Sequence, residues 1–551
     1  MKWMKRCLAG LVVLALAGWL TGAWLLRSWT NRPPALPADT SVMQLEPRTE
    51  EGKVWLGNTS LSRREGLLVI HLKGAPFEMG YATGVLMREQ MHTLESEFLT
   101  MVKGYVPNPA TLTVLKWYVI FQNRHLSEFV PAAYRTEILG ETLGCPDSHP
   151  ELGNYYNRML NYHAAHDVSY MMIDNPLVSP AGCTSFGVWG RASAEGHLIT
   201  GRNFDWEAAD VFGRDRVVQL YEPDEGIPFI SLSWAGMVGV VSGMNRAGVS
   251  VTINGAPSNL PGDTATPVAI VAREVLQRAH NLDEALILIR DAKVFVSTLW
   301  LLGSRADGRF IVVEKTPHTT QVRESDTDSI ICANHFQTPG LREAAPNASQ
   351  MDAATSVARG ERLAELLGQS ASPLDPERAA AMLRDRALRG GVFAGNGHRA
   401  SLNAFIATHS TIMDLTSGLF WAASPPHQLG RFVAFDVGDF SRDCSALSLS
   451  ADPVVASGEF ERGQQARRLL EEGRAAMARG DADAALALGG KAEALNPGFY
   501  QNARLRGQAL RALGRTAEAI QAIQAALGAH PAFMEERLEL ERWLAELEGS
   551  P

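Results

Sequence analysis

Two short segments carry residue types that could perform nucleophilic chemistry together. They are Gly182 to Phe186 (GCTSF) and, about twenty residues later, Gly201 to Trp206 (GRNFDW). If the peptide bond before Cys183 is cut, the freed α-amine titrates near about 8 and can accept the thiol proton. Arg202 then supplies a cation for a carboxyl group or thiolate, and Asp205 an anion for the α-ammonium. These residues predict a cysteine nucleophile that is activated by cleavage of the Gly182–Cys183 bond.

Each part of this prediction has an alternative. Cys183 could be an ordinary buried cysteine, but Gly182 favours the nucleophile. A residue without Cβ lets the preceding peptide adopt the strained geometry that an acyl shift from nitrogen to sulfur requires. Arg202 and Asp205 could form an exposed ion pair. Because side chains i and i+3 of a strand face opposite sides, we expect a turn or bulge near Asn203 to bring them to one site.

The two segments, with the upstream run from His71 to Gly84 (HLKGAPFEMGYATG), resemble the acyl-coenzyme A:6-aminopenicillanic acid acyltransferase family. This is peptidase family C45, one of the N-terminal-nucleophile hydrolases. The resemblance covers roughly residues 65 to 440. It implies an α+β fold of four αββα layers, self-cleavage before the cysteine and chemistry on linear amide bonds. It also implies that Asp205 binds the α-amine and that Arg202 contacts the nucleophile or substrate.

Acyl transfer also needs hydrogen-bond donors for the oxyanion of the tetrahedral intermediate. Asn254 ends a predicted strand and is placed as a side-chain donor, and Asn334 resembles the second site asparagine of the family. Each could instead be a turn residue. Arg399 is the best match to the distal arginine of the family. Three upstream arginines compete for that role, although their surroundings are typical of an exposed helix face: Arg384, Arg386 and Arg389.

Histidines suggest two further readings. His335 follows Asn334 and invites a cysteine–histidine pair as in ordinary cysteine proteases, but an α-amine makes a histidine base unnecessary, so we interpret His335 as a pocket residue. The spacings of His398, His409 and His427 suit no zinc pattern. No glycine-rich phosphate-binding segment occurs, and we expect neither a metal nor a cofactor.

Composition limits the class of protein. The chain has 551 residues, 46% hydrophobic and 20% charged, with a formal net charge of -9. This length favours two or more domains. The composition is that of a globular protein rather than a disordered or polytopic membrane protein. The acidic balance, with a pI near 5.9, gives no basic field for nucleic acid.

The N-terminus predicts export. Three basic residues precede an apolar run from Cys7 to Leu26, and twenty helical residues span about 30 Å, the thickness of a bilayer core. We predict a signal anchor with the body facing the periplasm or cell exterior; cleavage after Ala23 is the alternative. A proline-rich linker follows (residues 32–39).

The five cysteines are too few and too irregularly spaced for a disulfide scaffold. We interpret three of them as buried thiols, and one bridge involving the first of these remains an alternative: Cys145, Cys332 and Cys444.

Periodicity predicts the elements that must position these residues. Strands are expected at 66–74, 184–189, 197–202, 217–221, 229–234, 248–253, 297–302, 310–315, 329–334, 402–409 and 418–423. Helices are expected at 77–102, over much of 110–170 and at 267–292. Strand runs around a central helical block fit two stacked sheets that are covered by helices.

The last ninety residues contain a repeat. At an offset of 34 residues, Gly473 matches Gly507 and Pro497 matches Pro531, as do two alanine pairs. This resembles the tetratricopeptide repeat and predicts two repeats and a capping helix that pack on the body or on another copy. An alanine-rich helical cap without a ligand is the alternative.

Four regions follow: an anchor and linker (1–45), the N-terminal part of a hydrolase (46–182), its catalytic part (183–450) and the repeats (460–551). We expect an autoproteolytically activated amidohydrolase or acyltransferase that acts on N-acyl amides or peptides through a thioester acyl-enzyme. A non-catalytic scaffold that binds proteins through the repeats is the main alternative, and an ordinary cysteine protease that depends on His335 is a third.

Overall fold

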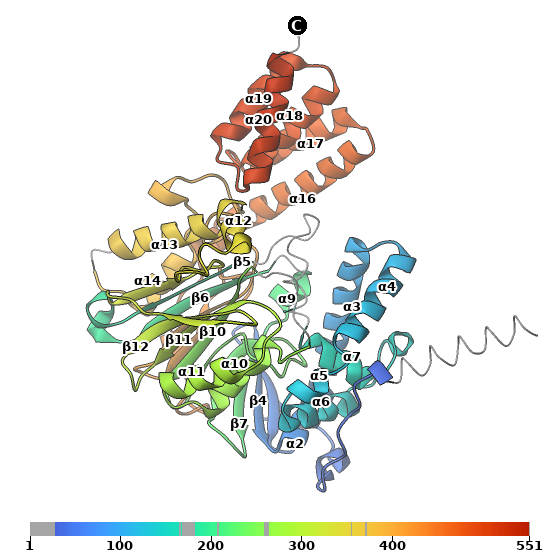
Figure 1. The fold of residues 1–551 in the computed structure, drawn as a ribbon, viewed down its shortest axis with the longest axis vertical. Helices are drawn as coiled ribbons and strands as arrows, with labels where there is room; N and C mark the ends of the chain where they lie inside the picture. Colours follow the sequence, from blue (N-terminus) through green and yellow to red (C-terminus); the bar gives the residue numbers. More distant parts are fainter. Residues whose placement is uncertain are drawn as a thin grey trace, which may run out of the picture.

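A computed structural model describes residues 28–164, 167, 182–206, 209–257, 264–353, 355–369 and 372–549. Over these residues two β-sheets lie face to face, with helices on both outer sides and a bundle of helices at the C-terminal end (Figure 1). The predicted α+β class with αββα layering is confirmed.

The larger sheet has eleven strands, in the order β1-β2-β3-β4-β7-β8-β9-β10-β11-β12-β13. Neighbours pair antiparallel except β4 and β7, which are parallel. The bounds are β1 Arg48–Glu50, β2 Lys53–Leu56, β3 Thr59–Arg64, β4 Leu67–Gly74, β7 Val217–Pro223, β8 Phe229–Ser233, β9 Ser242–Asn245, β10 Val249–Gly255, β11 Thr298–Ser304, β12 Arg309–Lys315 and β13 Thr320–Arg323.

The smaller sheet has six strands, in the order β14-β5-β6-β15-β16-β17, all antiparallel. The bounds are β5 Gly182–Val188, β6 Ile199–Asp205, β14 Ser329–Cys332, β15 Ala407–Asp414, β16 Leu419–Ala423 and β17 Phe432–Asp436. Every residue of β5 and β6 is buried. The two strands that carry the predicted site therefore lie inside the molecule.

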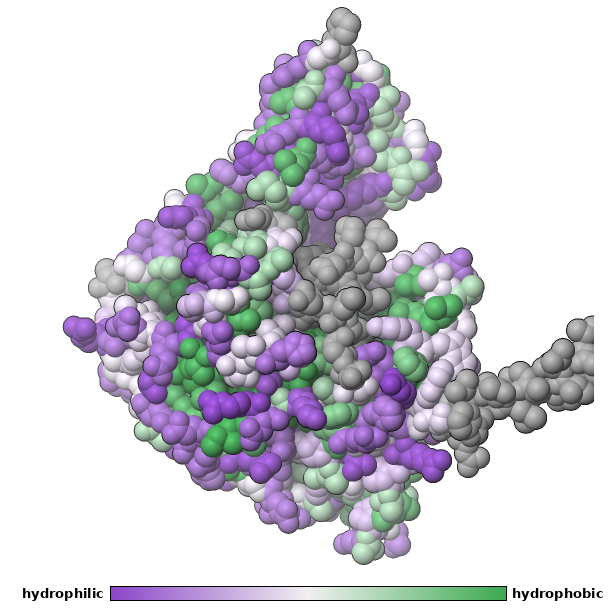
Figure 2. All heavy atoms as spheres, in the orientation of Figure 1, coloured by the Kyte–Doolittle hydropathy of each residue, from purple (hydrophilic) through white to green (hydrophobic). Residues whose placement is uncertain are grey.

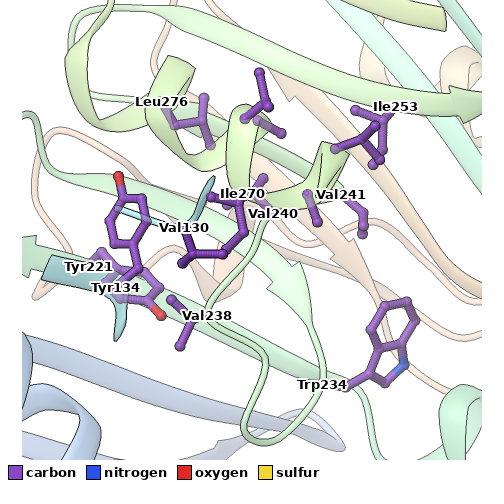
Figure 3. Packing of buried hydrophobic residues seen from close by; sticks show 14 of the residues in the cluster. Val130, Tyr134, Tyr221, Trp234, Val238, Val240, Val241, Ile253, Ile270 and Leu276 are labelled. Carbon is purple, nitrogen blue, oxygen red and sulfur yellow. The ribbon is translucent and has the colours of Figure 1, made fainter. Parts of the chain in front are cut away.

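Helices cover the outer faces of both sheets. On the larger sheet these are α10 (Val268–Arg278) and α11 (Leu282–Asp291), and on the smaller sheet α13 (Ser356–Gln369) and α14 (Pro376–Leu383). Figure 3 shows Ile270 and Leu276 of α10 in the same buried cluster as Val240, Val241 and Ile253. Burial of each such side chain contributes about 1.5–3 kcal/mol.

The N-terminal part is built into the larger sheet rather than standing apart, because β4 pairs with β7 across the Gly182–Cys183 junction. Glycines let α2 and α6 approach closely, since a Cβ at Gly80 or Gly140 would overlap the backbone of the other helix. The helices of this part are α2 Pro76–Leu86, α3 Arg88–Tyr105, α4 Pro109–Gln122, α5 Leu126–Phe129, α6 Ala132–Gly144 and α7 Tyr155–Tyr162. Shorter helices elsewhere are α9 Asp210–Arg214, α12 Ala345–Ala353 and α15 Pro453–Ala456.

The C-terminal bundle consists of two helix pairs and a final helix: α16 Glu459–Ala478, α17 Ala482–Leu495, α18 Tyr500–Ala512, α19 Thr516–Gly528 and α20 Met534–Glu548. The small residues of the 34-residue repeat lie at the contacts between helices. A Cβ at Gly473 would meet the side chain of Leu505, and one at Gly507 the side chain of Ile523. The visible outer surface of these helices is mostly hydrophilic (Figure 2). Whether they belong to the tetratricopeptide family stays a prediction.

Several element predictions need correction. The helix expected at 77–102 is interrupted at Met87, and the one at 267–292 is interrupted near Asn281, whose side chain caps α11. The strand expected at 402–409 begins only at Ala407, because the preceding residues form a loop against the C-terminal helices. Strands β1–β3, β9 and β13 were not predicted, since they are short or polar. Strand β17 was also missed, although it is mainly apolar and as long as β8.

The predicted anchor, residues 7–26, lies outside the described residues, so export and membrane attachment stay predictions. Within the part of the chain that the structure describes, no helix is both long and apolar enough to cross a bilayer. The described cysteines are all free and buried, including Cys145, Cys332 and Cys444. The bridge considered for Cys145 is therefore not formed there.

Candidate active site

Cys183 lies near the start of β5, between the two sheets. It pairs in register with Phe204 of β6, and its side chain shares a sheet face with Ser185 and Arg202. It is fully buried. Burial raises the pKa of the Cys183 thiol; the charge of Asp205 acts in the same direction, and the guanidinium groups of Arg202 and Arg359 oppose both.

Arg202 is the cation nearest to the thiol. Its Nη2 donates to Cys183 Sγ at 3.5 Å and also to the carbonyl oxygen of Ile253. Its Nη1 donates to the carbonyl oxygen of Val241 at 3.0 Å and to His409 Nε2 at 3.1 Å. The guanidinium carbon lies 4.4 Å from the centre of the Phe204 ring. This buried cation is held in one orientation by groups of both sheets.

Asp205 faces the opposite side of β6, towards α13. It pairs in register with Gly182, and its exposed fraction is 2%. Among the described residues, its Oδ1 atom is buried without a hydrogen-bond partner. Burial raises the pKa of Asp205 to about 6, although Arg359, Arg399 and Arg202 each lower it. A buried carboxylate oxygen without a donor is costly, and this one lies beside the predicted cleavage site.

The expected bulge at Asn203 is wrong. The β5–β6 register runs without a break from Gly182 to Val188, so Arg202 and Asp205 remain on opposite faces of the sheet. The irregularity lies in the neighbouring strand β15, between Ala407 and His409. The two faces converge on Cys183 for a different reason: its thiol points to one side, while its backbone nitrogen lies at the end of the strand.

Gly182 pairs in register with Asp205, and its missing side chain leaves room for neighbours. A Cβ there would lie 3.3 Å from Arg359 Nη2 and 3.7 Å from Asp205 Cβ. Glycine at this position therefore permits close packing, while the strain expected in the adjoining peptide stays a prediction.

Asn334 and Arg359 hold the backbone of Cys183. The backbone nitrogen of Cys183 donates to Asn334 Oδ1 at 2.7 Å, and Arg359 Nη2 donates to the same oxygen at 2.8 Å. Arg359 Nη1 donates to the Cys183 carbonyl oxygen at 2.6 Å and to the hydroxyl of Thr184. Asn334 Nδ2 donates to the carbonyl oxygen of Gly255 at 2.9 Å. The amide oxygen of Asn334, not its nitrogen, is turned towards Cys183.

Arg359 was not predicted from the sequence. It lies on α13, 176 residues after Cys183, and is buried with an exposed fraction of 3%. The one available signal is its place on the helix, because Arg359, Arg362 and Leu363 share the buried face of α13. A charged residue on such a face is normally paired, but its partner cannot be found from spacing.

Asn254 connects the two sheets rather than pointing a donor at Cys183. Its Nδ2 donates to the carbonyl oxygens of Cys332 and Ala333, each at 3.0 Å. Both protons of this amide are thereby engaged. An oxyanion role for Asn254 would require release of these bonds, whereas Asn334 Nδ2 donates to the single carbonyl oxygen of Gly255.

The predicted distal arginine, Arg399, is half-buried in a loop before β15, and its charge acts on Asp205. The three competing arginines have other partners. Arg384 donates to the carbonyl oxygens of Gln428 and Gly430, Arg386 pairs with Glu459, and Arg389 forms an exposed ion pair with Glu361. Of these four arginines, Arg399 is the one whose charge acts on Asp205.

The histidines have separate roles. His335 Nδ1 shares a hydrogen bond of 2.7 Å with Ser356 Oγ, and burial lowers the pKa of His335 to about 4. His409 bonds Arg202 and Ser242, and burial lowers its pKa well below the usual range. Within the described ranges, no three His, Cys, Asp or Glu side chains form a group that could hold a metal.

An apolar cavity of about 110 Å³ opens beside the Cys183–Phe204 pair. It lies between α3, α7 and the end of β6. Aromatic side chains form much of its wall: Phe98, Tyr162, Phe204, Trp206, Phe212 and Trp234. Val241, whose carbonyl oxygen anchors Arg202, lines it as well. Cys183 itself does not line the cavity, but its register partner Phe204 does.

Comparison with known proteins bears on the family that the chain resembles. The model of the family described as acyl-coenzyme A:6-aminopenicillanic acid acyl-transferase matches residues 192–394. The resemblance predicted from the sequence is confirmed. An uncharacterized protein of Archaeoglobus fulgidus is 25% identical over 348 residues, which are 57% of each chain. Protein dcd1B of Dictyostelium discoideum is 24% identical over 274 residues, 47% of this chain and 52% of that protein. The chain thus spans just over half the length of these two relatives.

Solved structures with distant similarity include an N-acylethanolamine-hydrolyzing acid amidase ortholog from Caenorhabditis elegans. It is 16% identical with a TM-score of 0.31, covering 42% of this chain and 93% of that chain. A conjugated bile acid hydrolase from Clostridium perfringens is 13% identical with a TM-score of 0.33, covering 46% and 92%.

Proposed function

We propose that this protein is an N-terminal-nucleophile amidohydrolase or acyltransferase that is activated by cleavage of its own chain before Cys183. The observation that carries the proposal is the buried Oδ1 of Asp205, which has no hydrogen-bond partner among the described residues and belongs to the residue paired with Gly182. Cleavage would create an α-ammonium within the same cluster and give this oxygen a cationic donor.

Activation would proceed in two balanced steps. Cys183 Sγ attacks the carbonyl carbon of Gly182, the C–N bond breaks, and a thioester joins Gly182 to the sulfur while the nitrogen gains the thiol proton. Water then hydrolyses the thioester to a Gly182 carboxylate and a free thiol. The new α-amine remains beside Asn334 Oδ1, which accepts from the same nitrogen in the intact chain at 2.7 Å.

The same groups would serve the reaction with substrate. The α-amine takes the thiol proton, sulfur attacks the amide carbonyl, and the α-ammonium returns the proton to the leaving amine. Arg202 stabilises the thiolate from 3.5 Å, and water or an acceptor amine finally takes the acyl group. The cavity beside Phe204 favours an apolar acyl group, because its wall is mainly aromatic.

Acyl-enzyme trapping tests this proposal. Purified protein is mixed with N-acyl amides of 7-amino-4-methylcoumarin that carry acetyl, octanoyl or phenylacetyl groups, quenched in acid and weighed by mass spectrometry. We expect one added acyl group on the chain that begins at Cys183, most with the apolar acyl groups and lost on treatment with hydroxylamine. The matched control is Cys332→Ala, which removes a second buried thiol. Labelling that survives Cys183→Ala, or none with any amide, would contradict the proposal.

A further inference from the structure

The loop of residues 394–406, which carries Arg399, is fastened to the C-terminal helices. The backbone nitrogen of Asn396 donates to Asn496 Oδ1 at 2.8 Å, and Asn496 Nδ2 donates back to the carbonyl oxygen of Asn396 at 2.9 Å. His398 Nε2 donates to the carbonyl oxygen of His530 at 2.7 Å. Its Nδ1 accepts from the backbone of Ala400 at 3.2 Å. Because one ring nitrogen donates and the other accepts, these two hydrogen bonds require a neutral His398. Burial lowers the pKa of His398, which favours that neutral form.

Packing strengthens this attachment. Gly395 has a φ of +86°, and a Cβ there would lie 2.6 Å from Phe499 Cβ, so only glycine permits the contact. The ring of Phe405 packs edge-on against Phe460 of α16, with centroids 5.3 Å apart. The loop is therefore held along its length by the helices rather than at one point.

The other side of the same loop meets the active site. The carbonyl oxygen of Leu402 accepts from Asn203 Nδ2 at 3.0 Å, and Ala407, the first residue after the loop, pairs in register with Asp205. Arg399 lies between these attachments to the helices and to β6, and its charge lowers the pKa of Asp205. The loop thus links the helical repeats to the carboxylate.

We propose that the helical repeats are a positioning element of the active site: through Asn496 and His530 they hold the 394–406 loop, which carries Arg399 and in turn holds the end of β6 that carries Asp205. This inference rests on the proposed function, which gives Asp205 its role. On this proposal the repeats stabilise a loop of their own chain. Asn396, His398 and Asn496 act as positioning residues, because they attach the loop to the repeats.

Hydrogen–deuterium exchange of the full-length protein tests the mechanical part. In Asn496→Ala, amides of residues 394–406 and of the end of β6 should exchange about tenfold faster or more, while those of α10 stay as in the wild type. The matched control is Arg511→Ala, which breaks an ion pair with Glu546 inside the repeats and touches no residue of the loop. Unchanged exchange at the end of β6, or an equal change in Arg511→Ala, would overturn the proposal.

The pH dependence of kcat/KM tests the chemical part, with octanoyl-7-amino-4-methylcoumarin as substrate. Without a nearby cation Asp205 should protonate at higher pH, so Asn496→Ala and Arg399→Ala should both move the acidic limb upwards. The expected loss at pH 5 is about threefold to tenfold, with little change at pH 8. The double variant should lose no more than Arg399→Ala alone, and additive losses would overturn the link. If wild-type protein hydrolyses no amide, the proposed function has failed, and the exchange experiment still decides the positioning role.

Discussion

The two faces of the β5–β6 pair carry charged side chains of opposite sign, and these differ in how fully their hydrogen bonds are satisfied. On the inner face, the guanidinium of Arg202 donates to two backbone carbonyls, a histidine and the Cys183 sulfur. On the outer face, Asp205 keeps a buried oxygen for which no described residue supplies a donor. Buried charges are normally paired. Under the proposed function, this difference means that the thiol side of the site has its partners in the intact chain, whereas Asp205 gains its donor only when cleavage creates the α-ammonium.

Removing the nucleophile should have the largest effect. Cys183→Ala should lower kcat for an N-acyl coumarin amide by about 10,000-fold or more, because no other group can form the acyl-enzyme. The measurement is fluorescence released per enzyme. In Cys183→Ser a weaker nucleophile remains, and slow turnover should persist. A kcat for Cys183→Ala close to that of the wild type would show that Cys183 is not the nucleophile.

The outer face is tested by Asp205→Asn, which should lower kcat/KM by about 100-fold or more because the α-ammonium loses its counter-charge. A conservative Asp205→Glu variant serves as control and should retain part of the activity. Wild-type kcat/KM in Asp205→Asn would show that the carboxylate of Asp205 is not needed for catalysis.

The same substitution has a stability signature with a defined sign. Burial raises the pKa of Asp205 from 3.8 to about 6, so between these values the folded state binds more protons than the unfolded state. The free energy of unfolding contributed by this group therefore falls as the pH rises through that window. In an uncleaved Cys183→Ala background, Asp205→Asn should add up to about 2–3 kcal/mol at pH 8 and little at pH 4. Urea unfolding at both pH values measures this; a gain at pH 4 instead would contradict the assigned pKa direction.

Arg359 sharpens the comparison, because it touches the backbone of Cys183 from the outer face. Arg359→Ala should slow chain cleavage and catalysis by about 10- to 100-fold, since Asn334 Oδ1 and the Cys183 carbonyl oxygen lose their donor. Arg389→Ala is the matched control, because Arg389 makes an exposed ion pair and should change either rate by less than about twofold. Gel analysis of cleavage and steady-state rates provide the measurements. Equal effects of the two variants would remove Arg359 from the site.

The smallest effect is expected for His335. Its imidazole bonds Ser356, and its pKa is lowered to about 4, so it is neutral at pH 7. Among the described residues it makes no hydrogen bond to Cys183. His335→Ala should keep activity within about fivefold of wild type. Loss of all activity with an intact chain would instead favour an ordinary cysteine protease.

Much of the catalytic strand pair could be predicted from the sequence. The residues of GCTSF and GRNFDW lie close together in the chain, and local patterns place Cys183 and Arg202 at the ends of the predicted strands 184–189 and 197–202. Asp205, expected beyond the second strand, is in fact the last residue of β6. Asn334, which the family resemblance suggested at the end of a predicted strand, also lies at the site, and its Oδ1 accepts from the backbone nitrogen of Cys183. The prediction of a bulge was wrong because it assumed that Arg202 and Asp205 must lie on the same face of the sheet. The thiol and the backbone nitrogen of Cys183 point in different directions, so residues on opposite faces can each lie near one of them.

Contacts over long sequence separations could not be predicted. Arg359 reaches Cys183 from a helix whose position depends on how α13 packs on the smaller sheet, and His409 reaches Arg202 across the β6–β15 pairing. The hydrogen bonds between Asn396 and Asn496 join residues that are 100 positions apart in the sequence. Periodicity identifies such helices and strands, but it carries no information about which polar side chains meet once they pack.

The intact mass of the purified full-length protein tests the central claim most directly. We predict two chains, one that ends at Gly182 and one that runs from Cys183 to the C-terminus, while Cys183→Ala yields a single uncleaved chain. The second chain should also carry a free α-amine that Edman degradation reads as Cys-Thr-Ser-Phe. A wild-type protein that remains one chain and matches Cys183→Ala in mass and behaviour would contradict the account and leave a scaffold as the better description.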